Sequence, residues 1–430
     1  MNLRRRGLQS QRQFYFLPAL VTQMIVPRVT HCIVPFAVHH RVAFCIFIFY
    51  FLIHPLSFIQ RILRRILFKP ISWASKRFSS KPDKERIFKS LDALHEAIIS
   101  GNEKKGLVVP FNATSDRFII FSDQHKGARN GADDFAPAEK NYLDALAYYQ
   151  QEDYFFINLG DSEELWENTL GQVKKHNAAT FTAEKAFIQK DKHIKIFGNH
   201  DLLWANDPLA GYYLKNLFGQ KVPIHEGVIL TTIVNETPLQ ILCTHGHQGD
   251  LQSDGNWFSK FFVSRIWAPL QSYLSINPNS PAFYDEVKSL HNSIMYQWSA
   301  LHKDIMLITG HTHQPVFASL THLERLYKQL QYASKNNQAD KVAELEAEIK
   351  RREREYKTLS VDYLTMKPGY FNSGCCCYSD GDITGLEISD GWLRLVKWKK
   401  ENGITLRIIL EEMSLTQLAE ENKQPLSNTN

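Results

Sequence analysis

Acidic residues are missing from the first fifth of the chain. Residues 1–82 contain 13 Lys or Arg and no Asp or Glu, and the first acidic residue is Asp83. Subtracting these 13 from the 50 basic residues of the whole chain leaves 37 against 45 acidic residues, so residues 83–430 carry a formal balance of −8. The overall charge of +5 therefore belongs to the N-terminal segment. A mildly acidic body argues against a surface dedicated to nucleic acid.

Cysteine pairs with the C-x-x-C spacing of a structural zinc site are also missing. The chain has six cysteines, and three of them, Cys375, Cys376 and Cys377, are consecutive. Neighbouring side chains of a strand point to opposite faces, so adjacent cysteines do not pair easily. This cysteine usage predicts reduced thiols and a cytoplasmic protein.

A simple signal peptide and an uninterrupted membrane-spanning run are absent as well. The apolar run 42–53 is interrupted by His54-Pro55 and resumes at 56–59, and it reaches the length of a span, about 18 residues, only across that break. Basic and apolar residues then mix over 61–78, which is typical of a helix lying on a bilayer surface. We interpret 1–82 as a basic apolar segment that associates with a membrane and leaves the body cytoplasmic. The alternative is a mis-assigned start that adds disordered sequence.

The body of the chain has the pattern of an α/β domain, which we place at 83–319. Apolar runs with strand character alternate with helical stretches, and the predicted strands are 118–121, 154–159, 194–197, 227–233, 239–244 and 305–309. Within this domain, residues 250–303 are helical in pattern and rich in aromatic residues. They are either core or a helical cap that offers an apolar surface to a lipid-like substrate.

The C-terminal third contains three segments with different sequence patterns. Residues 320–357 are rich in charged residues with leucines at helical spacing, which predicts a protruding helical hairpin. Residues 358–413 return to strand patterns and are expected to complete the α/β domain. Residues 414–430 are polar and are expected to form a disordered tail.

Polar fragments follow the predicted strands in five places. The fragment Gly198-Asn-His-Asp201 combines a tight exit from a strand with an amide oxygen, an imidazole and a carboxylate, and Asp201 could orient the ring of His200. The other four are Asp123-Gln-His125, Gly160-Asp-Ser-Glu-Glu164, His245-Gly-His247 and Gly310-His-Thr-His313. Loops at the carboxyl ends of strands in an α/β sheet meet in one crevice, so these fragments are expected to converge.

The side chains in these fragments are suited to divalent metals. The candidate set is Asp123, His125, Asp161, Asn199, His200, His245, His311 and His313. Oxygen and imidazole donors without thiolates suit manganese, iron or zinc. A single carboxylate, that of Asp161, could bridge two cations about 3.5–4 Å apart.

The five ordered blocks resemble the signature of the calcineurin-like metallophosphoesterase superfamily, which reads D-x-H, G-D-x-x-[DE], G-N-H-[DE], H and G-H-x-H. The resemblance covers residues 117–318, and every ligand position is filled. It implies an α/β fold in which a metallophosphoesterase-type β-sandwich is flanked by helices. It also implies two divalent metal ions, with manganese first among the candidates and iron, zinc or magnesium as the others.

The resemblance also assigns roles to single residues. One metal would be held by Asp123, His125, Asp161 and His313, and the second by Asp161, Asn199, His245 and His311. His200 would donate a proton to the leaving oxygen or stabilise charge there, with Asp201 holding its ring. The implied reaction is hydrolysis of a phosphodiester, pyrophosphate or phosphomonoester by attack of a metal-bound hydroxide.

Within the superfamily, the blocks resemble the UDP-2,3-diacylglucosamine hydrolase branch. That branch implies a phosphorylated small-molecule or lipid-linked substrate, and the basic apolar N-terminus fits a substrate at a membrane surface. A serine/threonine-type protein phosphatase is a weaker alternative, because such enzymes have Gly-Asn-His-Glu where this chain has Asp201. A non-catalytic, membrane-tethered scaffold that binds a protein partner through the 320–357 hairpin is the third interpretation.

Overall fold

The computed structural model describes residues 63, 65–66, 82–131, 133–249, 285–302, 304–352 and 367–423. The N-terminal segment expected to meet a membrane lies almost wholly outside these ranges, as do residues 250–284 of the aromatic insert. None of the helices within the described ranges has both the length and the hydropathy of a membrane span.

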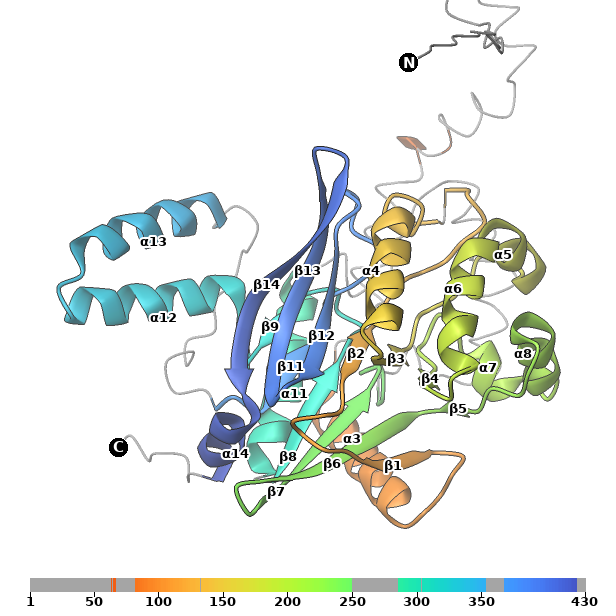
Figure 1. Cartoon of the computed structure of the whole chain (residues 1–430), viewed down its shortest axis with the longest axis horizontal. Coiled ribbons are helices and arrows are strands. Elements are labelled where there is room, and N and C mark those ends of the chain that lie inside the picture. The colour runs from red at the N-terminus through yellow and green to blue at the C-terminus, as the bar shows by residue number, and fades with distance from the viewer. Residues whose placement is uncertain are drawn as a thin grey trace, which may run out of the picture. The chain divides into compact units, whose positions relative to one another are not determined.

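Two mixed sheets, each of seven strands among the described residues, form the centre of the fold (Figure 1). The first runs in the order β1 (Gly106–Pro110), β6 (Gly227–Val234), β7 (Thr237–Thr244), β8 (Ile305–Thr309), β11 (Tyr370–Asn372), β9 (Val316–Phe317) and β10 (Leu320–Thr321). The second runs in the order β14 (Ile404–Ser414), β13 (Trp392–Glu401), β12 (Ile383–Ser389), β2 (Phe118–Phe121), β3 (Phe155–Leu159), β4 (His193–Ile196) and β5 (Ile224–His225). Strands β2 to β5 are parallel neighbours, so their carboxyl ends lie at the same edge.

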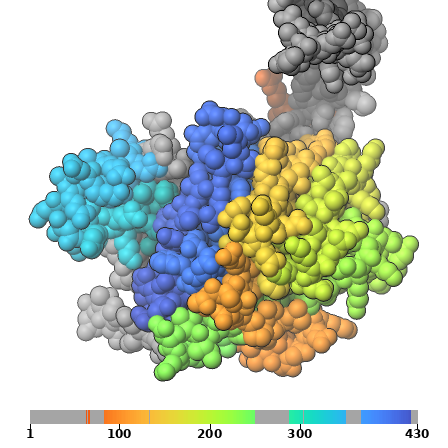
Figure 2. Space-filling model, in the orientation of Figure 1, coloured from red at the N-terminus to blue at the C-terminus, as the bar shows by residue number. Residues whose placement is uncertain are grey.

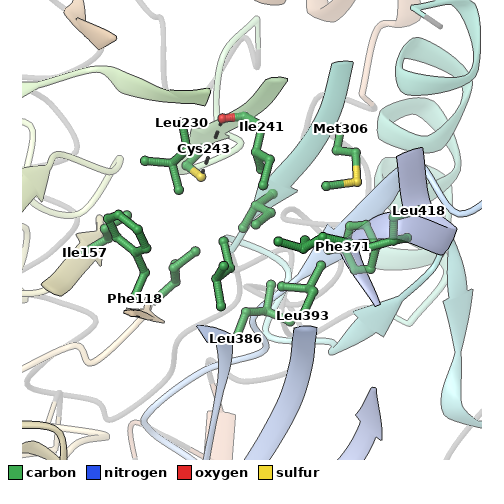
Figure 3. Packing of buried hydrophobic residues seen from close by; sticks show 14 of the residues in the cluster. Phe118, Ile157, Leu230, Ile241, Cys243, Met306, Phe371, Leu386, Leu393 and Leu418 are labelled. Atoms are coloured by element: carbon green, nitrogen blue, oxygen red, sulfur yellow. Dashed lines mark hydrogen bonds between the residues drawn. The ribbon is translucent and has the colours of Figure 1, made fainter. Parts of the chain in front are cut away.

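The main hydrophobic core lies between the two sheets (Figure 3). Ile157 and Leu386 of the second sheet pack in one cluster with Leu230 and Ile241 of the first, and all four are fully buried. Strand β2 is the apolar run Phe-Ile-Ile-Phe with every residue buried, because one face meets this core and the other meets a helix. The α/β fold with mixed sheets is therefore confirmed.

Helices cover the outer faces of both sheets. Helices α3 (Lys84–Ile99) and α11 (Asp285–Leu301) pack on the first sheet, and α4 (Glu139–Gln151) and α6 (Ala178–Ile188) pack on the second. Helices α5 (Leu170–His176), α7 (Leu203–Asn206) and α8 (Ala210–Phe218) form a further cluster beside α6, seen in yellow to green in Figure 2. Helix α3 illustrates the local cause: Asp83 caps it by accepting the Arg86 backbone N–H at 3.0 Å, and its buried leucines and isoleucines recur at helical spacing.

Two more helices, α12 (His322–Lys335) and α13 (Ala339–Arg352), share a separate hydrophobic cluster (Figure 1). Thr321 begins α12 with a capping box, in which its side chain and that of Glu324 satisfy each other's backbone amides. Arg325 joins α12 to β14 through an ion pair with Glu411 at 2.8 Å. This pair of helices occupies the region 320–357 that the sequence singles out.

One local expectation is wrong. The tail expected to be disordered from residue 414 contains α14 (Leu415–Lys423), whose Leu415 and Leu418 are buried in the main core. Helix α5 begins at Leu170, because Glu163 and Glu164 turn inward after β3. Strand β1 follows α3 after the connection 100–105.

Candidate metal centre

The candidate donors lie in loops directly after five strands. Asp123 and His125 follow β2, Asp161 follows β3, and Asn199 and His200 follow β4, all from the second sheet. His245 follows β7, and His311 and His313 follow β8, all from the first sheet. The carboxyl ends of strands from both sheets thus contribute to one buried cluster.

Asp161 lies in the middle of this cluster. Its Oδ2 atom is 3.8 Å from Nε2 of His125 and 3.1 Å from Nε2 of His245. Its Oδ1 atom accepts the backbone N–H of His200 at 2.7 Å, which fixes the carboxylate. One oxygen of Asp161 is therefore shared between two groups of donors.

The first group lies around Asp123. Oδ1 of Asp123 is 3.2 Å from Nε2 of His313, and this nitrogen is 3.1 Å from Nε2 of His125. The other carboxylate oxygen of Asp123 is held by the backbone N–H of His311 at 2.9 Å and by the Ser122 hydroxyl. Oδ1 is thus directed toward the imidazoles.

The second group lies around His245. Its Nε2 atom is 3.2 Å from Oδ1 of Asn199, and ligand atoms of Asp161, His245 and His311 lie within 4.8 Å of one another. Nδ1 of His245 is 3.0 Å from the Leu159 carbonyl oxygen. Nδ1 is therefore the protonated nitrogen of the neutral ring, and Nε2 is left as a donor to a metal.

The backbone at the centre is unusual in conformation. Five donors, Asp123, His125, Asp161, His311 and His313, have φ between 50° and 68°, in the left-handed region that side chains other than glycine rarely adopt. Such strain persists only where the surroundings fix it, and it concentrates at functional sites. Gly198 is required for a related reason, because a β-carbon there would collide with the Asp161 side chain.

His200 is held on three sides. Its Nδ1 atom is 2.7 Å from Oε2 of Glu164, and its ring stacks on Trp166 with a centroid distance of 4.3 Å. The ring of His125 meets it edge-on at 4.6 Å, and Nδ1 of His125 is 3.0 Å from the same Glu164 oxygen. Glu164 thereby orients two of the candidate histidines at once.

The expectation that Asp201 orients His200 is wrong. Oδ1 of Asp201 accepts the Gly198 backbone N–H at 2.6 Å, and Oδ2 accepts that of Ser162 at 3.0 Å. Burial raises the pKa of Asp201 to about 6, against the opposing effect of the Lys195 ammonium. Asp201 therefore clamps two loops together, and Glu164 has the orienting role.

The carboxylates and imidazoles of this cluster stabilise each other's charged forms. Burial alone would raise the pKa of Asp123, but His313 and His245 outweigh it and hold that pKa well below its usual value. Burial opposes the charged form of His245 and of His313 too, yet Asp161 raises the pKa of His245 to about 9, and Asp123 raises that of His313 to about 9. Without metal, protons therefore occupy nitrogens that a cation would need.

The donors fit divalent cations. Oε1 of Glu164 and Nε2 of His311 are buried and have no hydrogen-bond partner among the described residues. Unpaired buried polar atoms are destabilising, and a bound cation would satisfy such acceptors. Carboxylate, amide and imidazole donors around a shared carboxylate oxygen are what a pair of such ions requires.

The family comparison agrees with this chemistry. Residues 116–315 match the family of calcineurin-like phosphoesterases (Metallophos). The match covers 200 of the 430 residues. The matched residues include every candidate donor from Asp123 to His313.

Among solved structures, the chain matches Vacuolar Protein Sorting 29 from Cryptosporidium parvum at 12% identity, covering 70% of this chain and 99% of that one, with a TM-score of 0.29. A single mutant of Vps29 from Entamoeba histolytica matches at 13% identity, covering 69% of this chain and 99% of that one, with a TM-score of 0.25. No curated protein matches significantly.

The region around the centre also contains buried charges whose role the sequence does not reveal. Lys126 is fully buried, 2.6 Å from Glu184 and 3.2 Å from Glu163. Lys195 is 2.9 Å from Glu163, which also accepts the Trp204 indole N–H at 2.7 Å. This network fixes the segment that carries Asp161 and Glu164, and its only sequence signal is a pair of acidic residues beside a candidate ligand.

Part of the aromatic insert is visible in α11. Trp298 is fully buried in the core over the first sheet, as the core interpretation of that residue predicts. His291 reaches the centre, with its ring 5.2 Å from that of His311. Asn292 accepts hydrogen bonds from Thr312 at 3.2 Å and from the Tyr370 hydroxyl at 2.8 Å, which supports the loop of His311.

Proposed function

We propose that the protein is a metal-dependent phosphoesterase with a dinuclear centre. The observation that supports this most directly is the position of Asp161 Oδ2, 3.8 Å from His125 Nε2 and 3.1 Å from His245 Nε2. Asp123, His125 and His313 would hold one cation with Asp161, and Asn199, His245 and His311 would hold the other. Bound cations supply Lewis acidity toward phosphoryl oxygens and lower the pKa of water.

The residues of the chain have separate tasks in this reaction. Because Glu164 fixes Nδ1 of His200, Nε2 is the nitrogen available to protonate a leaving oxygen. Trp166 stacks on one face of the ring and restricts its rotation. Asp201 and Gly198 keep the two loops in register, so that Asn199 and Asp161 approach the same point.

The test is a metal-dependent assay on the full chain. Protein freed of metal by chelation is assayed with bis(p-nitrophenyl) phosphate and p-nitrophenyl phosphate before and after addition of Mn²⁺. We expect activity only after Mn²⁺ is added, and a loss of about 10²–10⁴-fold in kcat for His200→Ala with metal content retained. His176→Ala, an exposed residue of α5, is the matched control. Absence of turnover in the metal-loaded wild type would favour the scaffold alternative.

For the natural substrate we propose a phosphorylated small molecule or a lipid-linked phosphodiester or pyrophosphate, as in the UDP-2,3-diacylglucosamine hydrolase branch. The support is the block pattern with Gly198-Asn-His-Asp201, together with the basic apolar composition of 1–82 that suits a membrane surface. Profiling with nucleotide-sugar lipids, cyclic nucleotides and phosphoproteins separates this proposal from a protein phosphatase. Preferential turnover of phosphoproteins would reject it.

A further inference from the structure

A cysteine lies behind one of the candidate metal ligands. Cys377 follows β11, and its Sγ atom is 3.6 Å from Nδ1 of His313. Ligand atoms of His125, His313 and Cys377 lie within 4.8 Å of one another, and Cys377 is 9% exposed. Cys377 belongs to none of the five sequence blocks, so nothing assigned so far explains a thiol at this position.

Two other candidate metal-binding histidines also have a contact at Nδ1, and these contacts indicate the role of the one between His313 and Cys377. Nδ1 of His125 meets the Glu164 carboxylate, and Nδ1 of His245 meets the Leu159 carbonyl oxygen. A metal-binding histidine ordinarily donates its second ring N–H to such an acceptor, which fixes its tautomer and its orientation. For His313, whose Nε2 atom faces Asp123 at 3.2 Å, the atom in the acceptor position is the Cys377 sulfur.

The segment around Cys377 is hydrogen-bonded to the backbone of two residues of the first donor group, Asp123 and His313. The backbone N–H of Cys376 donates to the Asp123 carbonyl oxygen at 3.2 Å, and the Tyr378 hydroxyl donates to the His313 carbonyl oxygen at 3.1 Å. The Cys376 side chain points away, into the apolar cluster under α4. Cys376 therefore faces away from the centre, whereas Cys377 lies beside His313 and the Cys375 thiol interacts with both His313 and Cys377.

We propose that Cys377 positions His313 for metal binding by accepting its Nδ1 hydrogen, and that modification of this thiol releases the cation at the Asp123 end of the centre. The proposal rests on the dinuclear centre proposed above. Sulfur is a weak acceptor, and a substituent on it would fill the space between Cys377 and the ring. His313 would then turn out of line with Asp123 and His125.

The test measures metal content and affinity rather than turnover. Wild type, Cys377→Ala, Cys377→Ser and Cys376→Ala are loaded with Mn²⁺ and compared by elemental analysis and titration calorimetry. We expect Cys377→Ala to bind one of its two cations about 10–100-fold more weakly. Cys377→Ser, which keeps an acceptor, should recover most of that loss, and Cys376→Ala should bind as wild type. A merely structural role for the thiol would weaken Cys377→Ala and Cys377→Ser alike, or would lower Tm without selecting one cation.

A chemical arm tests the modification directly. In a background with Cys32, Cys45 and Cys375 replaced by Ser, methyl methanethiosulfonate transfers its methylthio group to the Cys377 sulfur, with methanesulfinate and a proton as the other products. We expect loss of one cation, reversed by dithiothreitol, and no such loss in Cys377→Ala. A sulfur-to-cobalt charge-transfer band in the Co²⁺-loaded wild type that vanishes in Cys377→Ser would overturn the proposal, because the thiolate would then be a ligand itself.

Two failures are distinguishable. If wild type binds two cations and Cys377→Ala binds both with unchanged affinity, the role of Cys377 is rejected and the dinuclear centre stands. If wild type binds no divalent cation, the dinuclear centre and the role of Cys377 are rejected together.

Discussion

Nδ1 of His200 lies 2.7 Å from Oε2 of Glu164, and this contact defines which residue controls the proposed proton donor. The same oxygen is 3.0 Å from Nδ1 of His125, a candidate metal ligand. Burial works against ionisation of Glu164, but the two histidines outweigh it and lower its pKa to about 2. One carboxylate therefore couples the proton donor to the metal centre.

Glu164→Gln should reduce kcat about 10–100-fold, because a neutral amide orients the two imidazoles less strongly than a carboxylate does. The measurement is the pH profile of kcat with bis(p-nitrophenyl) phosphate at saturating Mn²⁺. The mutation removes a charge next to His200, so the profile should also change its shape. Glu152→Gln, a carboxylate whose side chain is 43% exposed, is the control. Wild-type kcat in Glu164→Gln would exclude this role.

Asp201→Asn should affect stability more than the chemistry of His200. The asparagine oxygen can accept only one of the two backbone N–H groups, from Gly198 and Ser162, that Asp201 now satisfies. Leaving a buried donor unpaired destabilises by about 1–3 kcal/mol. Urea unfolding should detect this loss, while the pH profile of kcat keeps its shape. A changed profile with unchanged stability would restore Asp201 as the orienting residue.

Metal binding should release protons at neutral pH. The pKa values of His245 and His313 are raised to about 9, and hydrogen bonds to Asp123 and Glu164 raise that of His125 despite its burial. These rings are protonated at pH 7 and must lose their protons to bind a cation, so affinity should rise with pH and level off above about 9. Calorimetry in buffers of different ionisation enthalpy should count about two to three protons at pH 7. An affinity independent of pH between 6 and 9 would contradict this.

Lys195→Met should unfold more easily, because it leaves Glu163 with one fewer cation in a fully buried position. Breaking such a pair destabilises by about 3 kcal/mol. The double variant with Glu163→Gln should recover part of this loss, since the unpaired charge is gone. Lys192→Met, whose partner Asp153 is 68% exposed, should change the free energy of unfolding by less than about 1 kcal/mol. Equal effects of Lys195→Met and Lys192→Met would show that the buried network contributes nothing.

Much of the centre could be predicted from sequence because its residues stand in fixed places after strands. The run Phe118–Phe121 is apolar throughout, so its role as a strand and the placement of Asp123 after it follow from the pattern alone. Convergence of the donors followed from the placement of loops at the carboxyl ends of strands, and the sharing of Asp161 was implied by the family resemblance. The part of the fold that positions the donors could therefore be predicted from the sequence.

Contacts between side chains distant in sequence could not be predicted in the same way. Asp201 is adjacent to His200 in the chain, and adjacency suggested a contact that the turn after β4 prevents. Glu164 reaches His200 from another strand, so only the pairing of β3 with β4 brings them together. Helix α14 was missed because its polar face dominates the composition of the tail, although Leu415 and Leu418 are buried.

The central claim is that Asp161 bridges two cations, and electron paramagnetic resonance of the Mn²⁺-loaded protein tests it most directly. We predict two Mn²⁺ per wild-type chain with the spectrum of an exchange-coupled pair, and at most one uncoupled Mn²⁺ in Asp161→Asn. A single uncoupled Mn²⁺ in the wild type, or a coupled pair that survives in Asp161→Asn, would contradict the claim.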